Sequence, residues 1–205
     1  IHWPFPVENL TEAWETLIEL KTIGKIRWAG VCNCWETELD ELQKVSPVTS
    51  NQPMYSMLDR KIEDKVLPWC ETNNTGVLVY SPMHSGILTG KVSAEWLESL
   101  PENDWRKHKT DHPVVSPLHT EDGLQAFLIL QEELRSIAQR NNMSVGQLAV
   151  SWALRRKEIT SAIVGARKPG QIIETVQAAE KILSTEEEKI IMNHITNFEN
   201  KLNDA

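Results

Sequence analysis

The sequence predicts an α/β protein whose parallel strands alternate with helices, as in one half of a (β/α)8 barrel. Four short apolar runs are each followed by an amphipathic helical pattern, an alternation typical of a parallel sheet. The chain has 205 residues, whereas a complete barrel needs roughly 250. A four-stranded doubly wound sheet fits the same pattern. Against it, no glycine-rich G-x-G-x-x-G motif follows a strand and no phosphate-binding G-x-x-x-x-G-K-[ST] loop occurs.

Periodicity and proline positions define the elements of the first part of the chain. Leu10 and Trp14 begin a helical apolar face. Pro47 and Pro53 bracket the second strand, and Pro82 stops the third, because proline cannot donate to the ladder. The predicted elements, in order, are helix 10–21, strand 27–32, helix 37–44, strand 48–52, a helix around 62–69 and strand 77–80.

The second part of the chain opens with a polar stretch, 92–121, that contains several prolines and histidines. It is longer than a usual connection, and we expect an excursion loop with a short helix. Pro169 opens a later helix at its first position, and Ser184 with Glu187 forms a capping box. The predicted elements after the loop are helix 124–140, helix 144–156, strand 161–164, a helix from 169 and a terminal helix from 184.

Composition restricts the class of protein. The chain is 40% hydrophobic and 24% charged, which predicts a single globular domain over residues 1–205. The net charge of −8 argues against a general nucleic-acid partner or an anionic membrane. No apolar stretch has the length of a membrane span and no leader peptide opens the chain, so a cytoplasmic protein is expected. The three cysteines lack the second ligand pair of a zinc site, and we predict no metal.

Chemistry in a barrel is found at the carboxyl ends of the strands. The residues that follow the apolar runs include amides, a tyrosine and a basic cluster. This combination can hydrogen-bond a carboxamide, stack on a flat ring and neutralise a phosphate, as a nicotinamide dinucleotide phosphate requires. The residues are His2, Cys32, Asn33, Asn51, Gln52, Tyr80, Ser81, Pro82, Gly165, Ala166, Arg167 and Lys168.

Several segments, in order, resemble the C-terminal portion of the aldo-keto reductase superfamily, from the end of the fourth barrel strand onward. The resemblance covers essentially the whole chain. It rests on I-H-W-P at 1–4, G-K-I-R at 24–27, G-V-C-N at 30–33, N-Q-P-M-Y at 51–55, Y-S-P-M at 80–83 with G-I-L-T-G-K at 86–91, L-P with D-W-R at 100–106, and I-V-G-A-R at 163–167.

The resemblance implies roles for residues near the nicotinamide. His2 is expected to orient and polarise the substrate carbonyl. Asn33 and Gln52 are expected to bind the nicotinamide carboxamide, and Tyr80 to stack on the ring. Cys32 stands where the family commonly has serine, which weakens one hydrogen bond to the carboxamide.

The resemblance also implies contacts with the phosphates and the adenosine. Ser81 and Met83 are expected to line the pyrophosphate path, with Pro82 between them. Gln171 lies where some members carry an arginine, which leaves Arg167 to favour NADP over NAD. The residues assigned to the adenosine half of the cofactor are Gly165, Ala166 and Arg167 at the 2'-phosphate, Gln171 nearby and Glu174 at the adenosine.

The family reaction transfers a hydride between the nicotinamide and an aldehyde or ketone, with a tyrosine, a lysine and an aspartate that lie in the first half of the family barrel. This chain has only two tyrosines, both within other motifs, so His2 is its only member of the catalytic tetrad. We therefore expect a fragment of an NADP(H)-dependent reductase acting on a small carbonyl substrate. A non-catalytic nucleotide-binding regulatory or interaction subunit, and a half-barrel that forms a homo-oligomer, remain alternatives.

Overall fold

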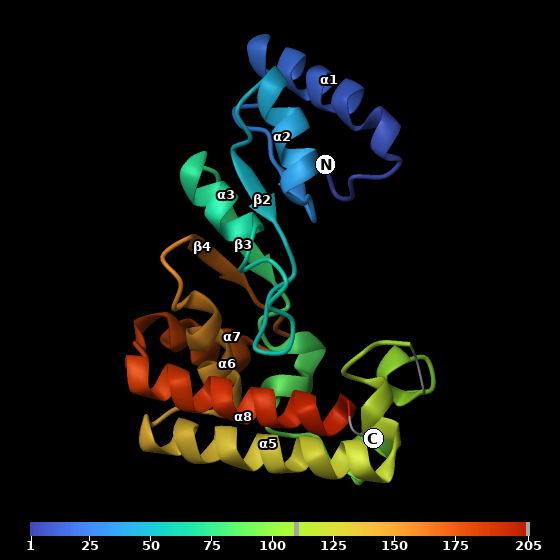
Figure 1. Cartoon of the computed structure of the whole chain (residues 1–205), viewed down its shortest axis with the longest axis vertical. Coiled ribbons are helices and arrows are strands. Elements are labelled where there is room, and N and C mark those ends of the chain that lie inside the picture. The colour runs from blue at the N-terminus through green and yellow to red at the C-terminus, as the bar shows by residue number, and fades with distance from the viewer. Residues whose placement is uncertain (109–110, 204–205) are drawn as a thin grey trace. The chain divides into compact units, whose positions relative to one another are not determined.

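The computed structural model describes residues 1–108 and 111–203, shown in Figure 1. The chain divides into two compact units. Unit 1 comprises Ile1–Pro82 with Ala153–Gly165, and unit 2 comprises Met83–Trp152 with Ala166–Ala205. The single domain expected from composition stays a prediction.

Unit 1 is built on a parallel sheet with the strand order β1-β2-β3-β4, which confirms the predicted parallel α/β architecture. Helices α1, α2 and α3 precede β1, β2 and β3 in turn, and Figure 1 shows them along the sheet. The elements are α1 (Leu10–Thr22), β1 (Val31–Cys32), α2 (Glu36–Val45), β2 (Ser50–Gln52), α3 (Val66–Thr72), β3 (Gly76–Tyr80) and β4 (Ile159–Ile163).

All four strands differ from their predicted bounds, and the first and last differ most. The first, expected over 27–32, pairs only at Val31 and Cys32, and Trp28 is 70% exposed. Gly30 lies so close to the next strand that an added Cβ would be 2.3 Å from the Ser50 hydroxyl oxygen. The last strand begins at Ile159, two residues before the expected start, because Val77 of β3 already pairs with Ile159.

Side chains alternate across β3. Val77 and Val79 are buried on one face, whereas Leu78 and Tyr80 are half-buried on the other. Ser161 and Ile163 of β4 pair with Leu78 and Tyr80 and are exposed. Because cross-strand partners share a face, this second face of the sheet is only partly covered within unit 1.

A polar cluster joins three segments of unit 1. Arg155 donates from Nη1 to the Tyr55 hydroxyl oxygen at 2.7 Å and from Nη2 to Glu63 Oε1 at 2.9 Å. The Tyr55 hydroxyl in turn donates to Glu63. Tyr55 is fully buried, and burial is the main cause that raises the pKa of its phenol, with Glu63 adding to it and Arg155 opposing it. The cluster ties the segment after β2 to the chain that enters β4.

Unit 2 is helical. Its long helices α5 (Glu121–Arg140) and α8 (Thr185–Asn203) lie side by side and run in opposite directions (Figure 1). Phe127 and Phe198 pack between them edge to face, with centroids 5.7 Å apart. The remaining elements are η2 (His84–Thr89), α4 (Ala94–Ser99), η3 (Trp105–Lys107), η4 (Ser116–His119), α6 (Val145–Leu154), α7 (Pro169–Val176) and η5 (Gln177–Glu180).

The helix boundaries of unit 2 follow their capping signals. Pro169 occupies the first turn of α7, as predicted. The Ser184 hydroxyl accepts from the Glu187 N–H, and the Glu187 carboxylate accepts from the Ser184 N–H, which confirms the capping box of α8. The polar stretch 92–121 forms α4, η3 and η4, with residues 109–110 outside the described part.

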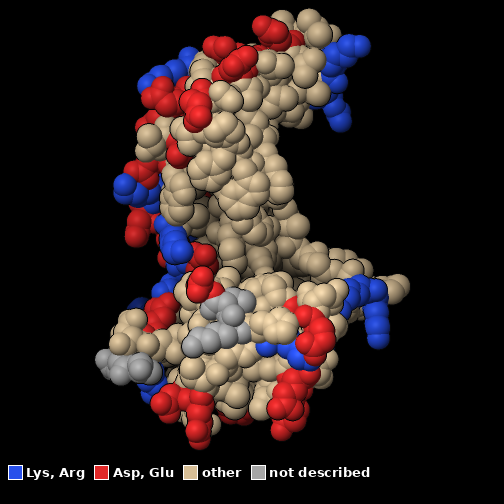
Figure 2. Space-filling model, turned by 90° about the vertical axis from the view of Figure 1, so that its right-hand side faces the viewer, with Lys and Arg blue, Asp and Glu red and all other residues tan. Residues whose placement is uncertain are grey.

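On the face shown in Figure 2, acidic and basic side chains gather toward the margins, large areas carry neither, and no continuous basic area is visible. This agrees with the net charge of −8. Among the residues described, no helix combines the length and apolar character needed to span a membrane.

The polar cluster of unit 1 yields a stability prediction. We expect Arg155→Met to lower the free energy of unfolding by about 3 kcal/mol, because it leaves the Glu63 carboxylate without its closest cation. Tyr55→Phe, which removes only the hydroxyl, should cost about 1 kcal/mol. Urea unfolding followed by circular dichroism measures both. A loss for Arg155→Met no larger than that for Tyr55→Phe would contradict this account.

Candidate functional site

In unit 1 the predicted nicotinamide residues gather at the carboxyl edge of the sheet. Asn33 directly follows β1 and adopts a left-handed conformation with φ of 56°. Its N–H donates to the Gln52 carbonyl at 3.2 Å, and its side-chain oxygen accepts from the Tyr80 hydroxyl at 3.1 Å. Gln52 ends β2 and Tyr80 ends β3. Two amides and a phenol ring, all half-buried, thus share one edge.

The Tyr80 phenol is held in its neutral form. Burial is the main cause that raises its pKa, the negative charge of Asp59 adds to it, and the hydrogen bond to Asn33 opposes it. The raised pKa makes the hydroxyl a weaker proton donor, and the hydrogen bond to Asn33 engages it, so the ring suits stacking on a planar group better than proton transfer. The ring is therefore a candidate platform at the sheet edge.

His2 lies beside β1, at the same sheet. The N-terminal amine of Ile1 donates to the Gly30 carbonyl at 2.9 Å, and the Cys32 N–H donates to the Ile1 carbonyl at 2.8 Å. Ile1 therefore extends the sheet beyond β1, and His2 is the next residue. Its side chain is exposed, with its ring 5.9 Å from that of Trp3.

Ser81 and Pro82 are the last residues of the first segment of unit 1, and Gly165 is the last residue of its second segment. Ser81 has φ of 60°, so the chain leaves β3 through a left-handed residue. Pro82 is buried and Gly165 is exposed. An added Cβ at Gly165 would contact nothing within 4 Å. No other atom therefore crowds the Gly165 backbone on that side.

In unit 2 the predicted phosphate residues lie at the start of α7. The Gln171 side-chain oxygen accepts from the N–H groups of both Arg167 and Lys168, at 2.7 and 3.0 Å. Gln171 therefore caps its own helix. Ala166, Arg167 and Glu174 are exposed, and the Glu174 carbonyl accepts from the Gln147 amide at 2.8 Å. The helix start and the arginine form an anion-binding environment.

Met83 begins unit 2 and precedes a left-handed turn. His84, Ser85 and Gly86 have φ of 48°, 54° and 91° in succession. Non-glycine residues in this conformation cost on the order of 1–3 kcal/mol each, so surrounding contacts must hold them. His84 is buried beside His112, with ring centroids 5.3 Å apart, and burial lowers its pKa to about 4.

The turn is contacted by the loop that follows α4. Arg106 donates to the Ser85 carbonyl at 2.6 Å and to both carboxylate oxygens of Asp104, at 2.9 and 2.5 Å. The hydrogen bonds from Arg106 are the main cause that lowers the pKa of Asp104 to about 2, and the charge of Arg167 adds a smaller contribution. The D-W-R segment is part of the sequence resemblance, but no role for Arg106 was predicted from it. An arginine two residues after an aspartate was the available signal.

The structure offers no metal site among the residues it describes, since no group of three or more metal-ligating side chains occurs there. Cys34 and Cys70 are buried, and burial raises the pKa of each thiol to about 12. These cysteines are therefore unreactive thiols.

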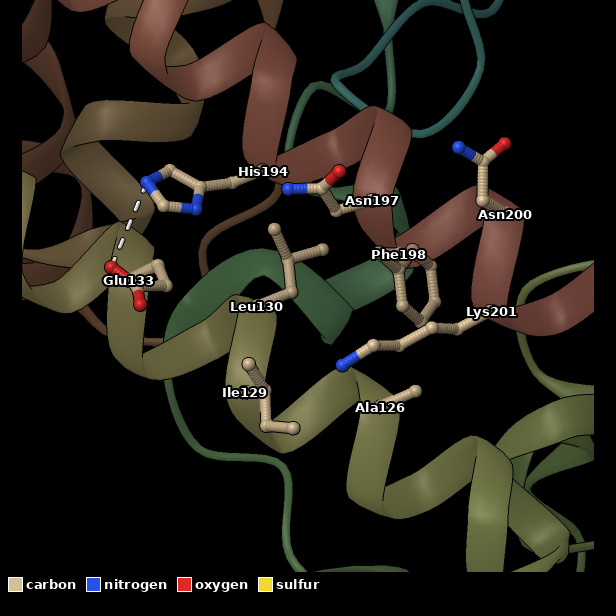
Figure 3. A pocket seen from close by; sticks show the side chains of 9 residues that line it. All are labelled: Ala126, Ile129, Leu130, Glu133, His194, Asn197, Phe198, Asn200 and Lys201. Atoms are coloured by element: carbon tan, nitrogen blue, oxygen red, sulfur yellow. Dashed lines mark ion pairs between the residues drawn. The ribbon is translucent and has the colours of Figure 1, made fainter.

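A separate groove lies between α5 and α8, with a volume of about 360 Å³ (Figure 3). Leu130 and Phe198 line it, His194 pairs with Glu133 at 3.6 Å, and the Lys201 side chain extends across it. None of its lining residues was predicted from the sequence as part of a site. The predicted cofactor residues of unit 2 lie instead at α7 and at Met83.

Comparisons with known proteins show the family of the chain. The Aldo/keto reductase family matches residues 1–196. Aldo-keto reductase YhdN of Bacillus subtilis (strain 168) is 32% identical over 198 residues, which cover 96% of this chain and 57% of that protein. The NADH-specific methylglyoxal reductase of Escherichia coli (strain K12) is 29% identical over 188 residues, covering 89% and 54%.

A solved structure shows the same fold. The glycerol dehydrogenase AKR11B4 from Gluconobacter oxydans has a TM-score of 0.85 and 30% sequence identity, with 97% of this chain and 57% of that chain covered. The chain thus spans little more than half the length of the relatives it matches. Because the family match covers nearly its whole length, this chain belongs to the aldo/keto reductase family.

Proposed function

We propose that this chain is the C-terminal part of an NADP-dependent reductase that transfers a hydride between the nicotinamide and a small aldehyde or ketone. The observation that carries the proposal is the arrangement of Asn33, Gln52 and Tyr80 at one sheet edge. The two amides supply the donors and acceptors that a carboxamide needs, and the phenol ring supplies a stacking face. His2, beside the same strand, is proposed to orient the carbonyl.

The adenosine end of the cofactor is assigned to residues that flank the start of α7. Arg167 is exposed, and its guanidinium can form charge-assisted hydrogen bonds with a phosphate. Gly165 and Ala166 precede it with exposed backbone, and Glu174 lies one turn beyond Gln171. Ser81, Pro82 and Met83 are proposed for the pyrophosphate path. The choice of NADP over NAD rests on Arg167. Family membership does not decide it, because a related reductase is named NADH-specific.

The fragment proposal rests on the residues that the family reaction needs. Tyr55 is fully buried and bonded to Glu63 and Arg155, and Tyr80 bonds to Asn33, so neither tyrosine is free to act as the general acid. The remaining catalytic groups are proposed to lie in a further segment of the natural protein, which corresponds to the part of the relatives that this chain does not span. The cytoplasmic location and the homo-oligomer stay predictions.

Nucleotide binding tests the proposal directly. We expect NADPH to quench the fluorescence of the tryptophans in the 205-residue chain and to gain nicotinamide fluorescence by energy transfer. The absence of a saturable signal with both NADPH and NADH would overturn the assignment. The intact mass of the natural polypeptide tests the fragment proposal, because a mass of 23.4 kDa would contradict it.

Arg167→Ala tests the nucleotide preference. We expect the Kd for NADPH to rise by about 10- to 100-fold, because a hydrogen bond to a charged group contributes about 1.5–3 kcal/mol, while the Kd for NADH changes little. Lys189→Ala removes the same charge from an exposed position on α8 and serves as the control. Equal losses for NADPH and NADH would remove Arg167 from the 2'-phosphate.

Tyr80 provides a second test through two substitutions. Tyr80→Phe keeps the ring and removes the hydrogen bond to Asn33, so we expect less than about a threefold rise in Kd for either nucleotide. Tyr80→Ala removes the ring, and the loss of stacking should raise both Kd values about tenfold or more. Titrations with NADPH and NADH measure both effects. If the two variants bind alike, the ring does not stack on the nicotinamide.

A further inference from the structure

The turn after Met83 fixes the backbone of Met83 itself. The N–H groups of Gly86 and Leu88 both donate to the Met83 carbonyl, each at 3.0 Å. These bonds require the successive left-handed conformations of His84, Ser85 and Gly86. The orientation of the Met83 carbonyl therefore depends on whether this turn is held in place.

Arg106 is the side chain that reaches the turn from the loop after α4. Its Nη1 donates to the Ser85 carbonyl at 2.6 Å, while Nε and Nη2 donate to the Asp104 carboxylate. The guanidinium also lies over the Trp96 ring, 5.4 Å from its centroid. All three nitrogens and the face of the group are engaged, and the side chain is only 12% exposed.

The backbone of Arg106 is itself fixed by hydrogen bonds within its loop. The Arg106 N–H donates to Asp104 Oδ1 at 3.0 Å. The Arg106 carbonyl lies 2.9 Å from His119 Nε2, and because a carbonyl only accepts, that nitrogen carries the proton. The loop therefore presents the guanidinium in one orientation. An arginine is required for this arrangement, because an ammonium cannot bridge a carboxylate and a carbonyl with a planar fork.

The space at Gly86 confirms how closely the two segments fit. A Cβ at Gly86 would lie 3.0 Å from Arg106 Nη1, and the φ of +91° is unfavourable for any other residue. The charge of Arg106 is meanwhile balanced by the bidentate contact with Asp104. These contacts favour a role through the turn over a direct contact with a phosphate.

We propose that Arg106 is a positioning residue for nucleotide binding, which acts by clamping the turn at Ser85 and thereby orienting Met83. This inference rests on the proposed function, which assigns Met83 to the pyrophosphate path. Because the pyrophosphate is common to both nucleotides, the clamp affects NADPH and NADH alike. It differs in this from Arg167, which distinguishes them.

Arg106→Lys tests the clamp in the full chain, with Kd values for NADPH and NADH measured by tryptophan quenching. The variant keeps the charge and loses the fork, and we expect both Kd values to rise about tenfold and by similar factors. Arg135→Lys is the matched control, since Arg135 likewise donates to a loop carbonyl, that of Gly90, at 2.9 Å and pairs with Glu132. We expect it to lower Tm comparably but to change either Kd less than about twofold.

Gly86→Ala provides a second route to the same turn and decides the question if Arg106→Lys does not fold. It should weaken both nucleotides similarly, and the double variant should bind no worse than the weaker single variant, because both changes act on one element. Unchanged Kd values for Arg106→Lys and Gly86→Ala, or a loss confined to NADPH, would overturn the clamp while the proposed function stands. If the unmodified chain binds neither nucleotide, the proposed function falls, and this inference with it.

Discussion

The parallel pairing of β1 to β4 is the constraint on which the proposed nicotinamide-binding edge of unit 1 depends. Parallel strands end at the same edge, so residues that are far apart in the sequence, such as Asn33, Gln52 and Tyr80, become neighbours because each lies at the end of a strand. The edge is then refined by individual bonds, because Asn33 contacts both of the other residues. An antiparallel arrangement would have dispersed these side chains over two edges.

Much of this arrangement could be predicted from the sequence, because the signals were local. The apolar run ending at Tyr80, the proline at the start of α7 and the Ser184–Glu187 capping box each specify an element through neighbouring residues. The first strand was predicted too long, because the residue types at 27–30 do not reveal that only Val31 and Cys32 pair with β2. Which residues pair is decided by the facing strand.

The contacts of Arg106 and Gln171 lay beyond sequence reasoning for a related reason. Each side chain makes bonds to backbone groups: Arg106, besides its pair with Asp104, donates to the Ser85 carbonyl, and Gln171 accepts from the N–H groups of Arg167 and Lys168. Backbone groups are the same at every position, so the sequence gives no hint of which one is reached. A motif such as D-W-R shows that an arginine has a nearby carboxylate, and leaves its other hydrogen bonds undefined.

The Gln171 cap has a consequence for the way an anion can enter at α7. The neutral amide oxygen already accepts from the two N–H groups that precede the helix. An anion that takes these donors therefore exchanges one acceptor for another, with no net gain in hydrogen bonds from the backbone. What remains to favour the exchange is charge, supplied by the helix dipole and by Arg167. The Gln171 amide thus competes with an incoming anion for these N–H groups. The competition lowers the affinity for weakly charged ligands more than the affinity for a doubly charged one.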